Sequence, residues 1–420
     1  LNRFYESVKM RAEGIESAEG KQKIIVELYD KFFRNAFPRM TERLGIVYTP
    51  LEVVDFIIHS VDYILRKDFN QSIESEKTNI IDPFTGTGTF ITRLLQSGLI
   101  SKDKITYKYR NEIHANEIIL LAYYIAAINI ESVYHDITQS QYEPFNGICL
   151  TDTFQLHEKD DLISQLLIDN SSRRTKQKKL DIRVIIGNPP YSAGQKDEND
   201  DNPNVSYPIL DKRIKDTYAN KSNATSTKNL IDSYIRAIRW ASDRINDSGV
   251  IGFVSGSGYI EKAAMDGMRK CLSEEFSSIY IINLRGDIRK NMLSNGKAQE
   301  GQNIFGSGSM TGIAITIFIK NAKSKQLGNI YYYDIGDNLK QNEKLEKLAA
   351  LKSIQGIDNL NKWEKIIPDS FGDWINKRDI NFYEYIVLGD KKDKLSKKLF
   401  SNYSQGILSS RDSWCFNFSK

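Results

Sequence analysis

The chain has 420 residues, of which 27% are charged and 40% hydrophobic; this ordinary globular composition excludes global disorder and indicates roughly two or three domains. The 58 basic and 54 acidic residues leave a net charge of only +4, so any contact with nucleic acid would depend on local basic patches. Three cysteines without a CxxC pair exclude a disulfide framework and argue against a metal site. The chain also lacks a long apolar run and a signal peptide, so we expect a cytoplasmic protein without a membrane span.

The amino-terminal residues 1–45 have a helical pattern and are predicted to form a helical segment ahead of the main domain. Their apolar side chains recur at spacings of three and four residues: Ile24, Ile25, Leu28, Tyr29, Phe32 and Phe33. In the next segment, 47–57, Thr49 is placed to cap a helix whose first turn contains Pro50. Because the first residue is Leu1 rather than Met, we expect the chain to be a piece of a longer polypeptide.

Seven apolar strands alternate with helices and are expected at 79–86, 113–117, 147–154, 182–191, 249–256, 277–286 and 312–320. Near-continuous runs of Ile, Val and Leu are typical of strands buried on both faces, so the alternation predicts an α/β fold with a doubly wound, mostly parallel, Rossmann-like sheet. We assign residues 46–335 to this domain and the lysine-rich, helical residues 336–420 to an extension. The long segments 169–181, 192–228 and 284–312 interrupt the pattern and are expected to be functional loops.

The first candidate site is a glycine turn between a strand and a helix, with the sequence DPFTGTG from Asp82 to Gly88. Its glycines, Gly86 and Gly88, let a ligand approach the backbone and the amino end of the helix. A triphosphate loop is excluded because no Gly-Lys-Ser or Gly-Lys-Thr follows, and Phe90 stands where a dinucleotide fingerprint needs a third glycine. Asp82 would repel a diphosphate but suits a cationic ligand such as S-adenosylmethionine, which carries an ammonium and a sulfonium. A tight turn without a ligand is the alternative interpretation.

Acidic residues also end the next two strands. Glu117 closes the second strand, where a carboxylate can accept both hydroxyls of a ribose, although it lies 35 residues after Asp82 (117 − 82 = 35) rather than about 20. Asp152 closes the third strand and can accept a hydrogen bond from the amino group of an adenine, with Phe154 against the ring. Taken alone, Glu117 could be a solvated acid and Asp152 a helix cap.

The most specific pattern is Gly187-Asn188-Pro189-Pro190-Tyr191, which follows a buried strand. Two prolines remove two backbone donors and stiffen the turn, so carbonyl oxygens project from it. The amide oxygen of Asn188 and the carbonyl of Pro189 can then accept both hydrogens of one planar amino group. That pairing leaves the nitrogen lone pair available to attack a methyl group, while Tyr191 offers a face for stacking a planar substrate.

Together with the glycine turn, this pattern resembles the gamma class of adenine-N6 DNA methyltransferases. The segment VYTPLEVVDFI (47–57) resembles the additional cofactor motif that this class carries before the glycine turn. Nearly all of the chain is similar to the methyltransferase region of Type ISP restriction-modification enzymes. The similar stretches are GNPPYS, YPILDKRIKDTYA, LIDSYIRAIRWASDRI, EFSSIYIINLRGD, IFGSGS and SSRDSWCFNFS. The combination is specific, although no single motif is. The sequence departs from the family pattern at Met310, where an Arg is expected after GSGS, so a DNA contact there is not implied.

The resemblance implies transfer of a methyl group from S-adenosylmethionine to the N6 amino group of an adenine flipped out of double-stranded DNA, as the modification part of a restriction-modification enzyme. Residues 1–45 would be a helical spacer, 46–335 the catalytic domain and 336–420 the lead into a target-recognition domain, with nuclease and helicase-like ATPase parts in the same polypeptide. The resemblance assigns the cofactor to Tyr48, Thr49, Pro50, Asp82, Phe84, Gly86, Gly88, Glu117, Asp152, Thr153 and Phe154. It assigns the target adenine to Asn188, Pro189, Pro190 and Tyr191. Asp82 and Asn188 would meet if the first and fourth strands are neighbours.

Other chemistries compete with this interpretation. Cytosine-C5 methylation is excluded, because it needs a cysteine after a proline and the three cysteines follow Ile148, Lys270 and Trp414. Cytosine-N4 methylation shares the geometry, although Ser or Asp is more usual in place of Asn188. The principal alternative is methylation of ribosomal RNA or of a protein glutamine, where NPPY-type sites also occur. A DNA-recognition module with a vestigial cofactor site is the non-enzymatic alternative.

Overall fold

The computed structural model describes residues 49–157, 168–190, 206–224, 228–287, 300–306 and 311–375, together with Lys290 and most of 377–404. The predicted amino-terminal helical segment, the site residues Tyr48 and Tyr191, and the position of Met310 lie outside the described residues. The chain forms two compact units, Leu1–Ile375 and Asn376–Lys420, and the first contains the candidate site.

One sheet forms the centre of the first unit, with nine strands in the described residues and the order β3-β2-β1-β4-β5-β7-β6-β8-β9. The strands are β1 (Asn79–Asp82), β2 (Ile113–Glu117), β3 (Ile148–Leu150), β4 (Ile182–Gly187), β5 (Ser248–Gly256), β6 (Ser278–Arg285), β7 (Ile313–Asn321), β8 (Asn329–Asp334) and β9 (Glu364–Ile366). Pairs from β3 to β5 are parallel, whereas β7 runs antiparallel to both β5 and β6. The predicted doubly wound, mostly parallel sheet is therefore confirmed.

All seven predicted strands are present, but the predicted number was too low because β8 and β9 were missed. In β8, with the sequence NIYYYD, only Ile330 and Tyr332 are buried, so it lacks the continuous apolar run by which the inner strands were recognised. Strand β9 has three residues, two of them exposed. Both strands, and the two helices between them, belong to the first compact unit, which extends to Ile375.

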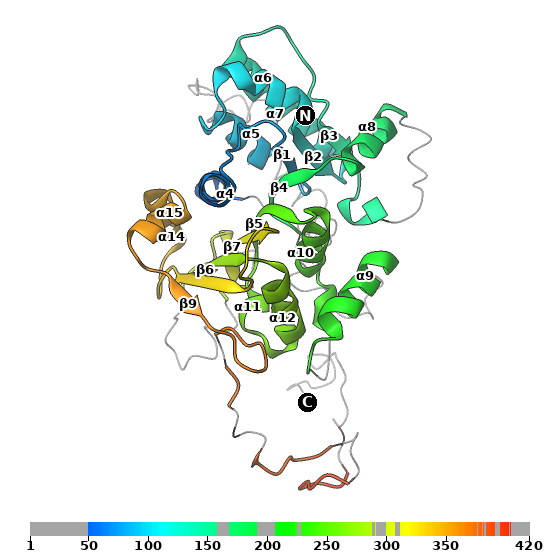
Figure 1. Ribbon diagram of the computed structural model, residues 1–420, viewed down its shortest axis with the longest axis vertical. Coiled ribbons are helices and arrows are strands. Elements are labelled where there is room, and N and C mark those ends of the chain that lie inside the picture. The colour runs from blue at the N-terminus through cyan, green and yellow to red at the C-terminus, as the bar shows by residue number, and fades with distance from the viewer. Residues whose placement is uncertain are drawn as a thin grey trace, which may run out of the picture. The chain divides into compact units, whose positions relative to one another are not determined.

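Helices cover both faces of the sheet (Figure 1). They are α4 (Leu51–Phe69), α5 (Thr89–Gln96), α6 (Lys102–Asn111), α7 (Leu120–Thr138), η1 (Thr153–His157), α8 (Ile168–Lys178), α9 (Pro208–Ile214), η3 (Lys215–Ala219), η4 (Lys228–Ile231), α10 (Ser233–Arg244), α11 (Gly258–Glu261), η5 (Ala263–Met265), α12 (Asp266–Glu275), α14 (Gln341–Leu351) and α15 (Ile354–Asn359). Figure 1 shows α4, α14 and α15 on one side of the strands, and α8, α9 and α10 on the other. In the second unit, the described residues include an isolated bridge between Val387 and Lys398.

Helix α4 directly follows the candidate site's first described residues, Thr49 and Pro50, and packs on β5 and β7. It comes so close to β5 that a Cβ at Gly252 would stand 2.8 Å from the side chain of Ile57. The expected helix cap at Thr49 is wrong, because the N-cap is Pro50 and no side chain caps the helix. The Thr49 hydroxyl instead accepts a hydrogen bond from Nδ2 of Asn188.

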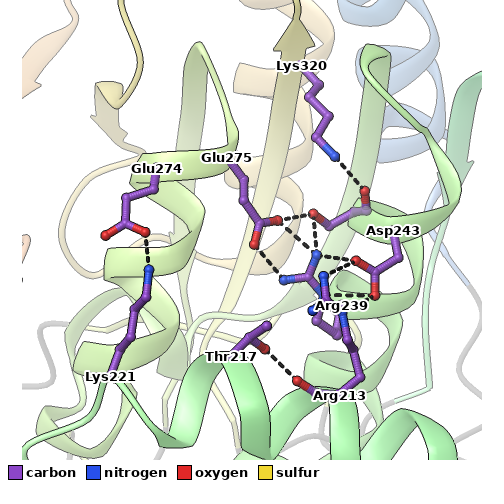
Figure 2. A network of polar contacts seen from close by, with 9 residues as sticks. Arg213, Thr217, Lys221, Arg239, Asp243, Glu274, Glu275 and Lys320 are labelled. Carbon is purple, nitrogen blue, oxygen red and sulfur yellow. Dashed lines mark hydrogen bonds and ion pairs between the residues drawn. The ribbon is translucent and has the colours of Figure 1, made fainter.

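A buried network of ion pairs joins α9, α10 and α12 (Figure 2). Arg239 of α10 is 1% exposed and donates to Glu275 of α12 (2.7 and 2.8 Å) and to Asp243 on its own helix (2.6 Å). Arg213 of α9 also binds Asp243, at 3.0 Å. Burial alone would raise the pKa of both carboxyls, but the bonds from the arginines outweigh it and lower both pKa values. The network therefore holds part of the predicted insertion 192–228 against the core.

Replacing Arg239 with Leu should lower the free energy of unfolding at pH 7 by about 3 kcal/mol, because two partly buried carboxylates lose their cation. The matched control is Lys221→Leu, which removes the solvent-exposed ion pair to Glu274 seen in the same view (Figure 2) and should change stability by less than about 1 kcal/mol. Urea unfolding of both variants measures the difference. Equal effects would contradict a stabilising role for the buried network.

Candidate active site

The carboxyl ends of β1 and β4 lie side by side, because the two strands pair in parallel, which was the condition for Asp82 and Asn188 to meet. Asp82 ends β1, and Gly187 ends β4 immediately before Asn188. A Cβ at Gly187 would stand only 2.8 Å from Oδ1 of Asp82, so this position accommodates only glycine. The glycine turn and the Asn-Pro-Pro turn thus meet at one edge of the sheet.

Asp82 is fully buried, and one of its carboxylate oxygens is unsatisfied. Oδ1 accepts a hydrogen bond from the backbone N–H of Phe84 at 3.0 Å, whereas Oδ2 has no hydrogen-bond partner within the described part of the chain. Burial raises the pKa of this carboxyl to about 8; the negative charge of Glu117 adds to the effect and the Phe84 bond opposes it. A buried acceptor in this state would be satisfied by a ligand that brings a positive charge and N–H donors.

Glu117, at the end of β2, holds the glycine turn in place. Its Oε2 accepts from the N–H of Gly86 at 2.8 Å, and its Oε1 accepts from the N–H of Ile119 at 2.7 Å. Gly86 and Gly88 have φ values of +57° and +88°, which L residues with a side chain rarely adopt. Burial raises the pKa of Glu117 to about 7 despite these backbone bonds. Each oxygen still has lone-pair capacity for a ligand hydroxyl.

The residues after β3 contribute to an aromatic cluster beside the glycine turn. Oδ1 of Asp152 accepts from the N–H of Phe154 at 2.9 Å, and burial raises the pKa of the Asp152 carboxyl. The ring of Phe154 packs against that of Phe84, with centroids 5.5 Å apart. Thr153, another predicted cofactor residue, donates its hydroxyl to the carbonyl of Pro83 at 2.6 Å and so ties this aromatic cluster to the glycine turn.

One residue of this cluster was missed in the sequence: Tyr207, which precedes α9. Its hydroxyl donates to Oδ2 of Asp152 at 2.9 Å, and its ring lies edge-on to Phe154. It comes from the predicted polar insertion, where no periodicity or motif links it to Asp152. Two signals could have marked it as structured: the Tyr-Pro pair, which places a proline at the first position of a helix, and the family-like stretch YPILDKRIKDTYA that begins at Tyr207.

Asn188 is oriented by the residue that precedes α4. Its Nδ2 donates to the hydroxyl of Thr49 at 2.9 Å, across 139 residues of sequence. Because the two polar atoms lie on opposite sides of the amide carbon, this bond turns Oδ1 away from Thr49. Pro189 is buried and Pro190 partly buried, so the turn is fixed on the sheet. The carbonyl of Pro50 accepts bonds from the first turn of α4, which makes Pro50 part of the helix start.

The structure therefore brings together most of the predicted site residues at one sheet edge. Acidic side chains end β1 and β2 and follow β3, and an Asn-Pro-Pro turn follows β4. Among the described residues, no group of three or more His, Cys, Asp or Glu side chains could hold a metal ion. None of the described helices has the length and apolar composition needed to cross a bilayer.

This fold and this site define a methyltransferase of the Rossmann-like class. The chain belongs to the N-6 DNA methylase family, whose pattern matches residues 20–388. The resemblance inferred from the sequence motifs is thus confirmed. A comparison with curated protein sequences gives no match.

Solved structures support the same assignment. The chain is 52% identical to the ATP-dependent Type ISP restriction-modification enzyme LlaBIII bound to DNA, with a TM-score of 0.88 over 98% of this chain and 27% of that one. It is 50% identical to a nuclease-deletion mutant of the Type ISP enzyme LlaGI in complex with a DNA substrate mimic (TM-score 0.85, 99% and 33%). It is 36% identical to DrdV in a DNA complex (TM-score 0.87, 98% and 40%). The chain therefore spans between about a quarter and two fifths of these relatives.

Proposed function

We propose that the chain is the methyltransferase part of a site-specific DNA-modifying enzyme that methylates the N6 amino group of adenine. The observation that carries this proposal is the meeting of two features at one sheet edge: the unsatisfied Oδ2 of Asp82 and the Asn188-Pro189-Pro190 turn. Membership in the N-6 DNA methylase family supports the reaction type. The three relatives named above are all solved with DNA, so ribosomal RNA or a protein glutamine is not favoured as substrate.

The residues present fit S-adenosylmethionine as the cofactor. Oδ2 of Asp82 would accept from its ammonium group, which needs the kind of buried, unsatisfied acceptor found there. Glu117 would take the ribose hydroxyls, and Asp152 the amino group of the adenine, with Phe84 and Phe154 as the apolar wall. When bound, the cofactor would supply a methyl group made electrophilic by the sulfonium.

The chain's own residues would activate and hold the target amino group. Oδ1 of Asn188 and the carbonyl of Pro189 would accept its two hydrogens, so the nitrogen lone pair is directed at the methyl group. Positive charge develops on that nitrogen, and two fixed acceptor oxygens stabilise it where it forms. The Thr49 bond orients the amide before the substrate arrives, and positioning of this kind contributes much of the rate. The step needs no strong base.

Adenine in a duplex cannot reach this edge without leaving the base stack. Flipping costs a few kcal/mol, which stacking on Tyr191, a residue outside the described part of the chain, would offset in part. We further propose that double-stranded DNA is the partner. We also propose that nuclease, helicase-like and target-recognition parts belong to the same polypeptide in the cytoplasm, since the relatives are restriction-modification enzymes much longer than this chain.

Calorimetry with S-adenosylmethionine tests the cofactor assignment. With pKa values of about 8 and about 7, Asp82 and Glu117 are largely protonated in the empty site at pH 6. A cationic ligand favours the ionised carboxylate, so binding should release protons, and affinity should rise several-fold between about pH 6 and 7.5, where the ligand's amino group remains charged. Titration in buffers of different ionisation enthalpy counts the protons. Absence of binding, or binding that neither depends on pH nor releases protons, would remove the assignment.

A further inference from the structure

Tyr207 connects the polypeptide that follows the Asn-Pro-Pro turn to the aromatic cluster beside Asp152. Its hydroxyl lies 2.9 Å from Oδ2 of Asp152, and its ring meets that of Phe154 at 74°, with centroids 5.2 Å apart. The side chain is only 8% exposed, although it belongs to a segment of polar composition. The ring of Tyr207 therefore belongs to the hydrophobic core, whereas its hydroxyl reaches the Asp152 carboxylate.

A second set of contacts fixes Tyr207 to the core. The guanidinium of Arg236, in α10, lies 5.0 Å from the centre of the Tyr207 ring, a cation–π contact. Arg236 is 4% exposed and binds Asp211 through two bonds of 2.7 and 2.8 Å. Asp211 in turn accepts from the N–H of Tyr207 at 3.2 Å and donates its own N–H to the Tyr207 carbonyl at 2.7 Å. Contacts to both its ring and its backbone therefore fix the position of Tyr207.

The chain reaches Tyr207 seventeen residues after Pro190 (207 − 190 = 17). One stretch of polypeptide thus starts at the turn that would hold the target amino group and is anchored at the residues that would hold the cofactor's purine. The carboxylate of Asp152 can serve Tyr207 and a purine amino group at once, because its two oxygens offer about four acceptor positions. The holding of the target amino group and the binding of the cofactor's purine would therefore both depend on Tyr207.

We propose that Tyr207 is a positioning residue that couples binding of a purine at Asp152 and Phe154 to the order of residues 206–214, at the start of α9. The proposal deepens the proposed function and rests on it. The Tyr207 hydroxyl holds the Asp152 carboxylate in the orientation that a purine amino group meets. A purine bound against Asp152 and Phe154 in turn restrains Tyr207 and the start of α9. Because such coupling is reciprocal, order imposed on this stretch by DNA would also strengthen cofactor binding.

The charges around Asp152 give this role a distinctive pH signature. Burial raises the pKa of the Asp152 carboxyl, and it is opposed by the Tyr207 bond, the backbone N–H groups of Phe154 and Gln155, and the charge of Arg236. Loss of the Tyr207 hydroxyl removes the first of these opposing contributions. The pKa of Asp152 should then rise further, so the part of the acid-side loss of affinity that Asp152 adds to that of Asp82 and Glu117 should set in at a higher pH than in the wild type.

The test uses Tyr207→Phe in the full chain, which keeps the ring and removes only the hydroxyl. Calorimetry at pH 7 should show S-adenosylmethionine binding about tenfold weaker, with the acid-side loss of affinity shifted to higher pH. Hydrogen exchange of peptides covering 206–214 should slow on cofactor binding in the wild type and not in the variant. The matched control is Tyr218→Phe in the same insertion, because Tyr218 is fully buried and its hydroxyl has no hydrogen-bond partner in the described residues. This control should leave affinity and exchange unchanged.

The outcomes separate this proposal from the proposed function. If the wild type binds the cofactor and Tyr207→Phe matches it in affinity, pH profile and exchange protection, the coupling role is wrong while the proposed function stands. A Tyr207→Phe variant that only melts at a lower temperature, with the other three readouts intact, would make Tyr207 merely structural and also overturn the proposal. A wild type that does not bind S-adenosylmethionine would overturn both.

Discussion

Asn188→Ala is expected to lower the rate of methyl transfer by about 10²–10³ while leaving the affinity for S-adenosylmethionine within about twofold. The rate falls because one of two fixed acceptors for the target amino group is lost, by analogy with the removal of one oxyanion-hole donor. Cofactor affinity is spared because the proposed cofactor contacts are Asp82 and Glu117, which end β1 and β2, and Asp152, which follows β3. Single-turnover transfer of labelled methyl to duplex DNA, with calorimetry in parallel, measures both quantities.

Thr49→Val serves as the graded companion to that variant. It keeps the Asn188 amide and removes only the hydroxyl that orients it at 2.9 Å, so its rate loss should be smaller, about tenfold. Full activity in Asn188→Ala would contradict the acceptor role. A parallel loss of rate and cofactor affinity would show instead that the turn belongs to the cofactor pocket.

Asp82→Asn should have two opposite effects: much weaker cofactor binding and a more stable ligand-free protein. Binding should weaken by roughly 1–3 kcal/mol, because a charged hydrogen bond to the ammonium is lost. Stability should rise by about 0.5–2 kcal/mol at pH 8, since a buried carboxylate with one unsatisfied oxygen is replaced by a neutral amide of the same shape. The wild-type protein is thus less stable than the variant, because it keeps a buried acceptor unsatisfied until the cofactor binds.

The sign of the pH dependence follows from the raised pKa of Asp82, about 8. The contribution that the protonated carboxyl makes to stability is fully present below its ordinary pKa, near 4, and is lost as the pH rises towards 8. The advantage of Asp82→Asn over the wild type should therefore grow from pH 4 to pH 8. Thermal unfolding over this range measures it, with Asp136→Asn, on the exposed side of α7, as the control that should change little. A variant that is less stable than the wild type at pH 8 would be inconsistent with this account of Asp82.

The parts of the fold that sequence reasoning predicted are those marked by local patterns. The inner strands β1, β4 and β5 are buried on both faces and read as apolar runs, and β1 and β4 end in turns whose glycines and prolines are visible in the sequence. Strands β8 and β9 lie at the far side of the sheet, where partial exposure removes that signal. The strand number was therefore too low, although the class was right.

Contacts between distant residues were not predictable in the same way. The bond of Thr49 to Asn188 and the bond of Tyr207 to Asp152 each join residues more than fifty positions apart. Local rules placed Thr49 as a helix cap, and only the folded chain brings its hydroxyl to the amide instead. Likewise the packing of Tyr207 depends on Arg236 and Asp211, whose pairing no spacing rule specifies.

The most direct test of the central claim is the identity of the methylated product. The intact protein, incubated with labelled S-adenosylmethionine and duplex DNA, should place the label in N6-methyladenine on nucleoside analysis, and Asn188→Ala should place about 10²–10³-fold less there in the same time. Label in N4-methylcytosine, in RNA or in a protein glutamine, with none in adenine, would contradict the account.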